Sequence, residues 1–270
     1  MRPLWFVKLL KKAFPSIKYL ARLTRIPILT KIFELLLFRE DEIIYLPKDQ
    51  VIPINMEVSK PEDMVLPSRV LEYFIKKAKH HWIMDFCICR ASMECEDYPI
   101  NLGCLFLGDG VLEINPRLGK QVSKEEALNH LEKCKEAGLV HLIGRNRLDK
   151  QWLGVKQGTK LLTICNCCPC CCLWRISPIL SPKLGSNVKR MEGIEIKVTD
   201  KCIACGECTH GVCFVDAIKI VNNKAQINDE CRGCGRCVEI CPQDAIELKV
   251  NNLKESVQVS INQINSIIEL

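Results

Sequence analysis

The feature that most constrains this chain is a short cysteine pattern that occurs twice near its C-terminal end. In each copy, three cysteines are spaced by two residues, and a fourth cysteine begins a block that is itself repeated, residues 213–218 and 241–246. The first copy contains Cys202, Cys205, Cys208 and Cys213, and the second contains Cys231, Cys234, Cys237 and Cys241. An internal repeat of this kind predicts two structurally equivalent halves. We call residues 193–250 the cysteine repeat.

The spacing of these cysteines is typical of metal ligation. A Cys-x2-Cys-x2-Cys loop supplies three thiolates from a short arc of backbone, as an iron–sulfur cluster requires. Zinc is the structural alternative, because two Cys-x2-Cys pairs can close a tetrahedral site. The third cysteine of each loop and the distant fourth one favour clusters, since together they provide eight ligands for two [4Fe-4S] cubes.

The cysteine repeat resembles the bacterial two-cluster ferredoxin family, in which the fourth cysteine of each half ligates the other cluster. The resemblance implies a ferredoxin-like fold. It also implies two ligand sets, Cys202, Cys205, Cys208 and Cys241 for the first cluster, and Cys231, Cys234, Cys237 and Cys213 for the second. The second half fits the family pattern, with Pro242 directly after Cys241. The first half departs from it, because four residues separate Cys208 from Cys213 where three are usual, and Phe214 replaces the proline. We expect a small bulge there, with all eight ligands retained.

Cysteine accounts for 19 of the 270 residues, and either disulfides or metal must explain this density. Lys11, Lys12 and Pro15 interrupt any apolar signal sequence. Adjacent cysteines such as Cys167 and Cys168 suit disulfide geometry poorly. We therefore expect reduced thiols, a cytoplasmic setting and bound metal.

Eleven cysteines lie outside the repeat, and six of them fall within residues 165–172. If that run is extended, Cys165, Cys167 and Cys171 share one face while Cys168, Cys170 and Cys172 favour the other, and Pro169 bends the strand. We predict a third metal site, an iron–sulfur cluster or zinc. Its candidate ligands are Cys87, Cys89, Cys95, Cys104, Cys165, Cys167, Cys168, Cys170, Cys171 and Cys172. We expect the eleventh thiol, Cys134, to be a small buried hydrophobe.

A second resemblance covers the region that precedes the repeat. It rests on Cys87-Ile88-Cys89-Arg90, Tyr98-Pro99, Leu102-Gly103-Cys104 and the polycysteine run. These motifs are similar to the N-terminal part of uncharacterised ferredoxin-domain proteins of anaerobes. The resemblance implies no reaction, and catalytic residues stay unassigned, as do His80, His81 and His210.

Residues 1–38 combine eight basic side chains with a single acid, Glu34, and many large apolar residues at helical spacings. No apolar run is long enough to span a bilayer. Basic amphipathic helices interrupted at Pro15 and Pro27 can lie on an anionic membrane surface. The alternative is that they dock on the rest of the protein. Nucleic acid is a less favoured partner, because large aliphatic residues interrupt the positive charge.

Composition divides the chain into five segments of an α+β protein. Residues 1–42 form the basic amphipathic helical segment, and the prolines of residues 43–67 indicate an extended connector. Residues 68–185 form a cysteine-rich α+β domain, with a helix starting at the capping box of Ser123 and Glu126, and strands near residues 139–143 and 160–164. A helix followed by a hairpin suggests a winged-helix-like arrangement. The cysteine repeat at 193–250 and an amphipathic helix at 251–270 follow.

The function that these features favour is single-electron transfer to or from a redox partner protein. Neither a glycine-rich nucleotide loop nor a nucleophile signature is present in the sequence, so a carrier or electron-transfer subunit is favoured over a stand-alone enzyme. Two alternatives remain. One is a reductase, an oxidoreductase with an unusual catalytic cluster in the cysteine-rich domain, and the other is a redox- or metal-sensing regulator. The expected location is the cytoplasm. Residues 1–38 suggest that the protein could also lie on the inner face of the membrane.

Overall fold

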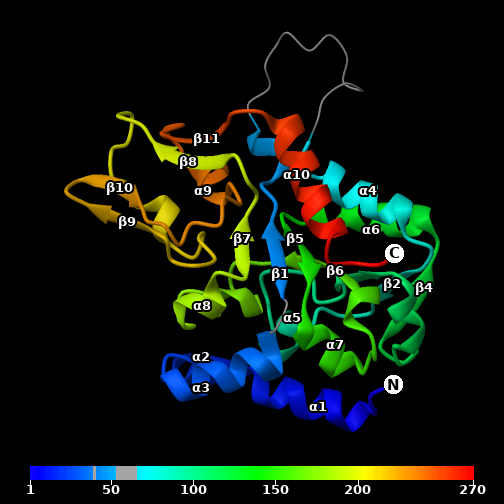
Figure 1. Ribbon diagram of the computed structural model, residues 1–270. Helices are drawn as coiled ribbons and strands as arrows, with labels where there is room; N and C mark the ends of the chain where they lie inside the picture. Colours follow the sequence, from blue (N-terminus) through cyan, green and yellow to red (C-terminus); the bar gives the residue numbers. More distant parts are fainter. Residues whose placement is uncertain (39–40, 53–65) are drawn as a thin grey trace.

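A seven-stranded sheet organises most of the chain that precedes the cysteine repeat (Figure 1). The computed structural model describes residues 1–38, 41–52 and 66–270. Neighbouring strands are antiparallel except β1 and β7, which pair in parallel at one edge. In order across the sheet, the strands are β4 (Gly119–Val122), β2 (His81–Met84), β3 (Leu105–Leu107), β6 (Leu162–Cys167), β5 (Val140–Arg145), β1 (Glu42–Tyr45) and β7 (Val188–Arg190).

Helices cover both faces of this sheet, because its central strands are apolar on both sides. On one face, Leu105 and Leu107 of β3 share a core with α4, α6 and α10. On the other face, Phe106 packs against residues of α1 and α7. The bounds are α1 (Leu4–Ala13), α4 (Arg69–Lys77), α6 (Lys124–Glu136), α7 (Arg147–Leu153) and α10 (Leu253–Asn265). The alternation of side chains along β3 therefore fixes which helices lie on which face.

Shorter helices complete this part of the protein. They are α2 (Ile17–Leu23), α3 (Pro27–Phe33), a π-helical turn at Glu34–Phe38, α5 (Ile88–Ser92) and α8 (Pro182–Gly185). Ala21 and Phe38 are buried in a core with Trp174, Leu180 and Leu184. The segment from α2 to the π-helical turn is therefore anchored to the rest of the chain at both ends.

The cysteine repeat folds into two small antiparallel pairs beside the large sheet (Figure 1). Strand β8 (Ile194–Val198) pairs with β11 (Ile246–Val250), and β9 (Ile218–Val221) pairs with β10 (Lys224–Ile227). Asn222 and Asn223 join β9 to β10 with φ angles of 50° and 59°. Such positive angles at both central residues are those of a tight hairpin turn. The short helix α9 (Arg236–Ile240) begins within the second cysteine loop and carries Cys237.

The α+β class is confirmed, but the cysteine-rich part is larger than a winged helix. The strands expected near residues 139–143 and 160–164 are β5 and β6, which pair antiparallel in the middle of the seven-stranded sheet. Glu42–Tyr45, at the start of the expected connector, is strand β1 of the same sheet. The winged-helix-like expectation was wrong because strands distant in sequence add to the hairpin on both sides. Residues 53–65 of the connector lie outside the described residues.

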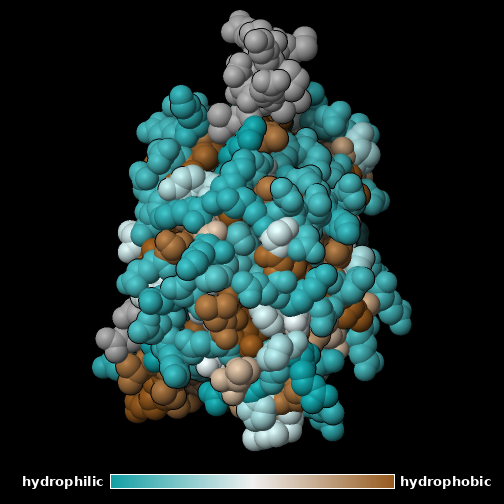
Figure 2. Space-filling model, turned by 90° about the vertical axis from the view of Figure 1, so that its right-hand side faces the viewer, coloured by the Kyte–Doolittle hydropathy of each residue, from teal (hydrophilic) through white to brown (hydrophobic). Residues whose placement is uncertain are grey.

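Several large apolar side chains of the N-terminal helices remain exposed. Trp5, Leu9, Leu23 and Ile28 are examples, and Ile28 is 74% exposed. Figure 2 shows hydrophobic surface gathered at the lower end of the molecule, the end at which α1–α3 lie in Figure 1. Among the described residues, no helix has both the length and the apolar character needed to cross a membrane.

Candidate metal centres

The first cysteine loop and the last cysteine of the repeat surround one small hollow. Its lining includes Cys202, Cys205, Cys208 and Cys241. The backbone N–H of Ala225 donates to Sγ of Cys202 at 3.3 Å. Cysteines from both halves of the repeat are therefore brought to the same place. Amide donors aimed at sulfur favour the charged thiolate over the neutral thiol.

The second loop is arranged around Cys213 in the corresponding way. Burial, followed by the nearby charges of Cys213 and Cys231, accounts for a pKa of about 12 at the Cys234 thiol. The same two effects raise the pKa of Cys237. Ionisation of these partly buried thiols is unfavourable unless a cation replaces the proton. Cys213, Cys231 and Cys234 all pack against one core cluster, which brings three of the four ligands expected for the second cluster into one region.

The extra residue between Cys208 and Cys213 leaves Cys213 in a position that corresponds to that of Cys241 in the second half. The N–H of Ala217 donates to Sγ of Cys213 at 3.3 Å, and the N–H of Ala245 donates to Sγ of Cys241 at the same distance. The extra residue is absorbed in the preceding loop, where Gly211 has a φ of 68°. The local bulge expected from the sequence is consistent with this glycine.

The polycysteine run is extended only at its beginning. Strand β6 ends at Cys167, and a turn around Pro169 follows. The turn changes the grouping expected for a fully extended strand, because Cys171 lies with Cys168 and Cys170, whereas Cys172 returns to the side of Cys167. The ten candidate ligands therefore separate into two groups.

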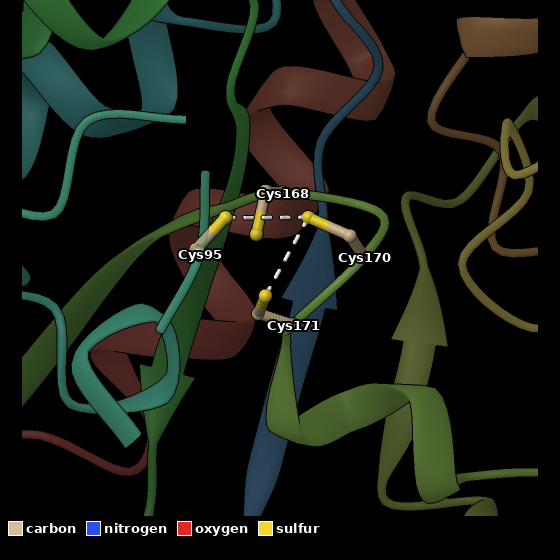
Figure 3. A group of neighbouring side chains, drawn as sticks. All are labelled: Cys95, Cys168, Cys170 and Cys171. Carbon is tan, nitrogen blue, oxygen red and sulfur yellow. Dashed lines mark hydrogen bonds between the residues drawn. The ribbon is translucent and has the colours of Figure 1, made fainter. Parts of the chain in front are cut away.

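Figure 3 shows the first of these, the four-cysteine group of Cys95, Cys168, Cys170 and Cys171. All four sulfur atoms lie within 4.8 Å of one another. Cys170 Sγ is 3.5 Å from Cys95 Sγ and 3.6 Å from Cys171 Sγ. Tetrahedral zinc with four thiolates at about 2.3 Å requires sulfur–sulfur distances of about 3.8 Å. The group has the dimensions of a ligand set for one tetrahedral ion.

The remaining six thiols line a cavity of about 340 Å³. We call it the six-cysteine cavity; its thiols belong to Cys87, Cys89, Cys104, Cys165, Cys167 and Cys172. The neighbouring thiols of Cys104 and Cys167 hydrogen-bond to Cys165 and lower its pKa well below the usual range. Cys87 is affected similarly by Cys89, and its pKa falls to about 7.

Arg90 is a functional residue that the sequence reasoning did not single out. It is fully buried and donates hydrogen bonds to the carbonyl oxygens of Pro99, Leu102 and Asn166. Burial alone would lower its pKa, but the neighbouring thiols of Cys87 and Cys168 outweigh that effect and hold the pKa above its usual value. The only sequence signal was its position directly after Cys89. Arg90 places a permanent positive charge beside both the four-cysteine group and the six-cysteine cavity.

Cys134 is near the candidate ligands in the core, but we do not assign it as a ligand. It is fully buried, and burial raises the pKa of its thiol to about 12. Its sulfur is not among the four that converge in the four-cysteine group. This environment is that of a small buried hydrophobe, as expected.

Comparison with known proteins gives one match. The family model of the LdpA Fe-S cluster-binding domain matches residues 209–251. The matched part covers a minor share of the chain and includes Cys213, Cys231, Cys234, Cys237 and Cys241. The search of curated proteins and the search of solved structures returned no match. The similarity supports an iron–sulfur cluster-binding domain in the cysteine repeat.

Proposed function

We propose that this chain is an electron-transfer protein whose cysteine repeat holds two [4Fe-4S] clusters. The first would be bound by Cys202, Cys205, Cys208 and Cys241, and the second by Cys231, Cys234, Cys237 and Cys213. The proposal is supported by the hollow that Cys202, Cys205 and Cys208 line together with Cys241 of the other half, and by the packing of Cys213 with Cys231 and Cys234. The matching amide donors to Cys213 and Cys241 support the pairing. A [4Fe-4S] cluster changes its charge by one electron at a time.

The two positions differ in how they face the solvent. Cys205 is exposed, and Ile203 beside it is 64% exposed. Cys234 belongs to the other set, and its surroundings include the buried side chains of Tyr45 and Phe214. A redox partner protein would therefore approach the first cluster, and the second cluster would pass electrons into the interior.

We further propose that the four-cysteine group binds one metal ion or a small iron–sulfur centre. Crowded thiolates repel one another, and a cation removes that repulsion. The sulfur–sulfur distances favour a single zinc or iron ion over a cube, whose corner thiolates stand farther apart. Such an ion would fasten the loop after β6 to the segment that carries Cys95.

The N-terminal helices support a proposal about the protein's location. Exposed Trp5, Leu9 and Ile28 lie in a segment that also carries Lys12 and Lys18 on its surface. Apolar side chains beside basic ones match the interface of an anionic membrane. We propose that residues 1–38 hold the protein on such a surface, while anchoring residues such as Val7 remain in the core.

Metal analysis of the anaerobically purified protein tests the electron-transfer proposal. Cys205→Ala and Cys234→Ala should each lose about four iron atoms, with an equal amount of acid-labile sulfide, because each removes one ligand of one cluster. Cys134→Ala is the matched control, since it removes a buried thiol that lies outside every proposed ligand set. Full iron content in both ligand variants would contradict the assignment.

A further inference from the structure

The six-cysteine cavity is built from three segments that are far apart in sequence. Cys87 and Cys89 lie at the start of α5, Cys104 directly precedes β3, and Cys165 and Cys167 lie in β6. Cys172, beyond the turn that follows β6, lines the same cavity. Convergence of thiols from separate segments around one space is the arrangement that a multinuclear cluster requires.

The cavity differs from an ordinary cysteine-containing core. The cavity has a volume of about 340 Å³, which is about ten times the share of one water molecule in the liquid. The lining of this space combines thiols with apolar residues of the N-terminal helices, including Phe6, Leu10 and Phe14. Thiols that served only as hydrophobes would pack against those side chains. The space is therefore suited to an occupant that sulfur ligates.

The cavity and the four-cysteine group are distinct although they are adjacent. Cys168 belongs to the four-cysteine group and also reaches the cavity wall. Arg90, which lines the same wall, contacts the Cys168 side chain. The guanidinium thus lies where the negative charges of two neighbouring centres would otherwise meet. A fixed cation there lowers the repulsion between two loaded thiolate sites.

A buried path leads from the cavity to the cysteine repeat. Tyr45 is fully buried, and its hydroxyl group has no hydrogen-bond partner within the described structure. Cys167 and Cys172 belong to the same core cluster as Tyr45, and Cys234 packs against that cluster. Its ring also packs against Phe214, with ring centroids 5.6 Å apart. Tyr45 therefore lies between the cavity and the proposed second cluster.

We propose that Cys87, Cys89, Cys104, Cys165, Cys167 and Cys172 hold an iron–sulfur cluster of their own, separate from the four-cysteine group. We also propose that it exchanges single electrons with the second cluster of the cysteine repeat across Tyr45. Each transfer oxidises one centre by one electron and reduces the other by one. The electron-exchange part rests on the proposed function of the repeat, whereas the metal-binding part does not.

Two double variants of the full-length protein test whether the sites are separate. The unmodified protein should contain about twelve or more iron atoms, because the repeat accounts for about eight. Cys87→Ala with Cys165→Ala should remove about four iron atoms and their sulfide while metal at the four-cysteine group remains. Cys95→Ala with Cys171→Ala should remove only the metal of that group. Cys134→Ala should leave all metal in place.

Several outcomes would overturn the proposal. An unmodified protein with only about eight iron atoms has no cluster in the cavity. Loss of the same metal from both double variants would mean that the ten thiols form one centre. If Cys87→Ala with Cys165→Ala does not fold, the single variant Cys89→Ser replaces it, and its melting temperature shows whether it is folded. Unchanged iron and sulfide in that variant would also count against the cluster. If the cysteine repeat holds no clusters, Cys205→Ala and Cys234→Ala would lose no iron. That result is distinct from the absence of a cluster in the six-cysteine cavity.

Electron paramagnetic resonance tests the connection to the repeat. In the fully reduced protein, the signal of the cavity cluster should be broadened by spin coupling to the second cluster. In Cys234→Ala that broadening should disappear while the cavity retains its iron. An identical signal in both proteins would place the cavity cluster out of contact with the repeat and overturn the electron-exchange part.

Discussion

The guanidinium of Arg90 donates a hydrogen bond of 2.8 Å from Nη1 to the carbonyl oxygen of Asn166. Asn166 lies between two cysteines of β6, and Arg90 follows Cys89 in α5. The side chain of Asn166 donates in turn to the carbonyl oxygen of Gly103, beside Cys104. One buried arginine and one asparagine therefore hold together the three segments that carry the thiols of the six-cysteine cavity.

Replacing Arg90 with lysine should loosen this arrangement. An ammonium group keeps the charge, but it cannot reproduce the fork of donors that reaches three carbonyl oxygens. We expect a loss of about 3 kcal/mol or more in stability, and a lower metal content outside the cysteine repeat. Thermal melting and metal analysis measure both effects. Arg69→Lys, at a partly exposed arginine paired with Glu72, is the control and should change neither. Full metal content in Arg90→Lys would show that charge alone is sufficient.

Two glycines of the cysteine repeat should differ in their tolerance of alanine. Gly235 has a φ of 81°, and an added Cβ would lie 2.3 Å from Cγ2 of Val51. Gly211 has a φ of 68°, but an added Cβ would meet no atom within 4 Å. Gly211→Ala should therefore cost about 1 kcal/mol through backbone strain alone. Gly235→Ala should cost clearly more, because it also separates the repeat from Val51. Equal melting temperatures for the two variants would refute this explanation.

Membrane attachment should depend on the charge of the N-terminal helices. Changing Lys11, Lys12 and Lys18 to Glu should release the protein from anionic vesicles, since each basic contact contributes about 1 kcal/mol. Co-sedimentation with vesicles that contain phosphatidylserine measures the effect. The same charge change at exposed lysines elsewhere, Lys124, Lys201 and Lys254, is the matched control and should have little effect. If the unmodified protein does not sediment with the vesicles, these helices serve only to dock on the protein.

Asp41 should make stability depend on pH. Burial raises the pKa of its carboxyl group from 3.8 to about 7, although Oδ1 accepts a hydrogen bond from the backbone N–H of Arg147. The folded state thus favours the protonated form. Its contribution to stability is complete below the unfolded pKa and is lost as the pH rises toward 7.

The variant Asp41→Asn removes this dependence, because the amide is neutral at every pH. Its melting temperature should exceed that of the unmodified protein by several degrees at pH 8, and the difference should shrink toward pH 5.5. Asp200→Asn is the control. Asp200 pairs with Lys224, which lowers the pKa of this carboxyl group, so it stays ionised throughout that range. A difference for Asp41→Asn that does not vary with pH would contradict the raised pKa.

Features that depend on local spacing could be predicted from the amino-acid sequence. The repeated cysteine loops, the hairpin at Asn222 and Asn223, and the capping box at Ser123 and Glu126 all involve residues close together in the chain. Their geometry follows from backbone and side-chain preferences that a short window contains. Strands β5 and β6 were also predictable for this reason.

Features that depend on segments far apart in the chain could not be predicted in this way. The sheet orders its strands as β4-β2-β3-β6-β5-β1-β7, and no local pattern specifies that β1 lies between β5 and β7. The turn at Pro169 and the position of Cys95 separate ten candidate ligands into two groups, which residue alternation along one strand did not reveal. Arg90 gained its role from carbonyl oxygens contributed by three different stretches of the chain. The sequence shows which residues are cysteines, but which of their thiols share a metal depends on how separate segments pack in space.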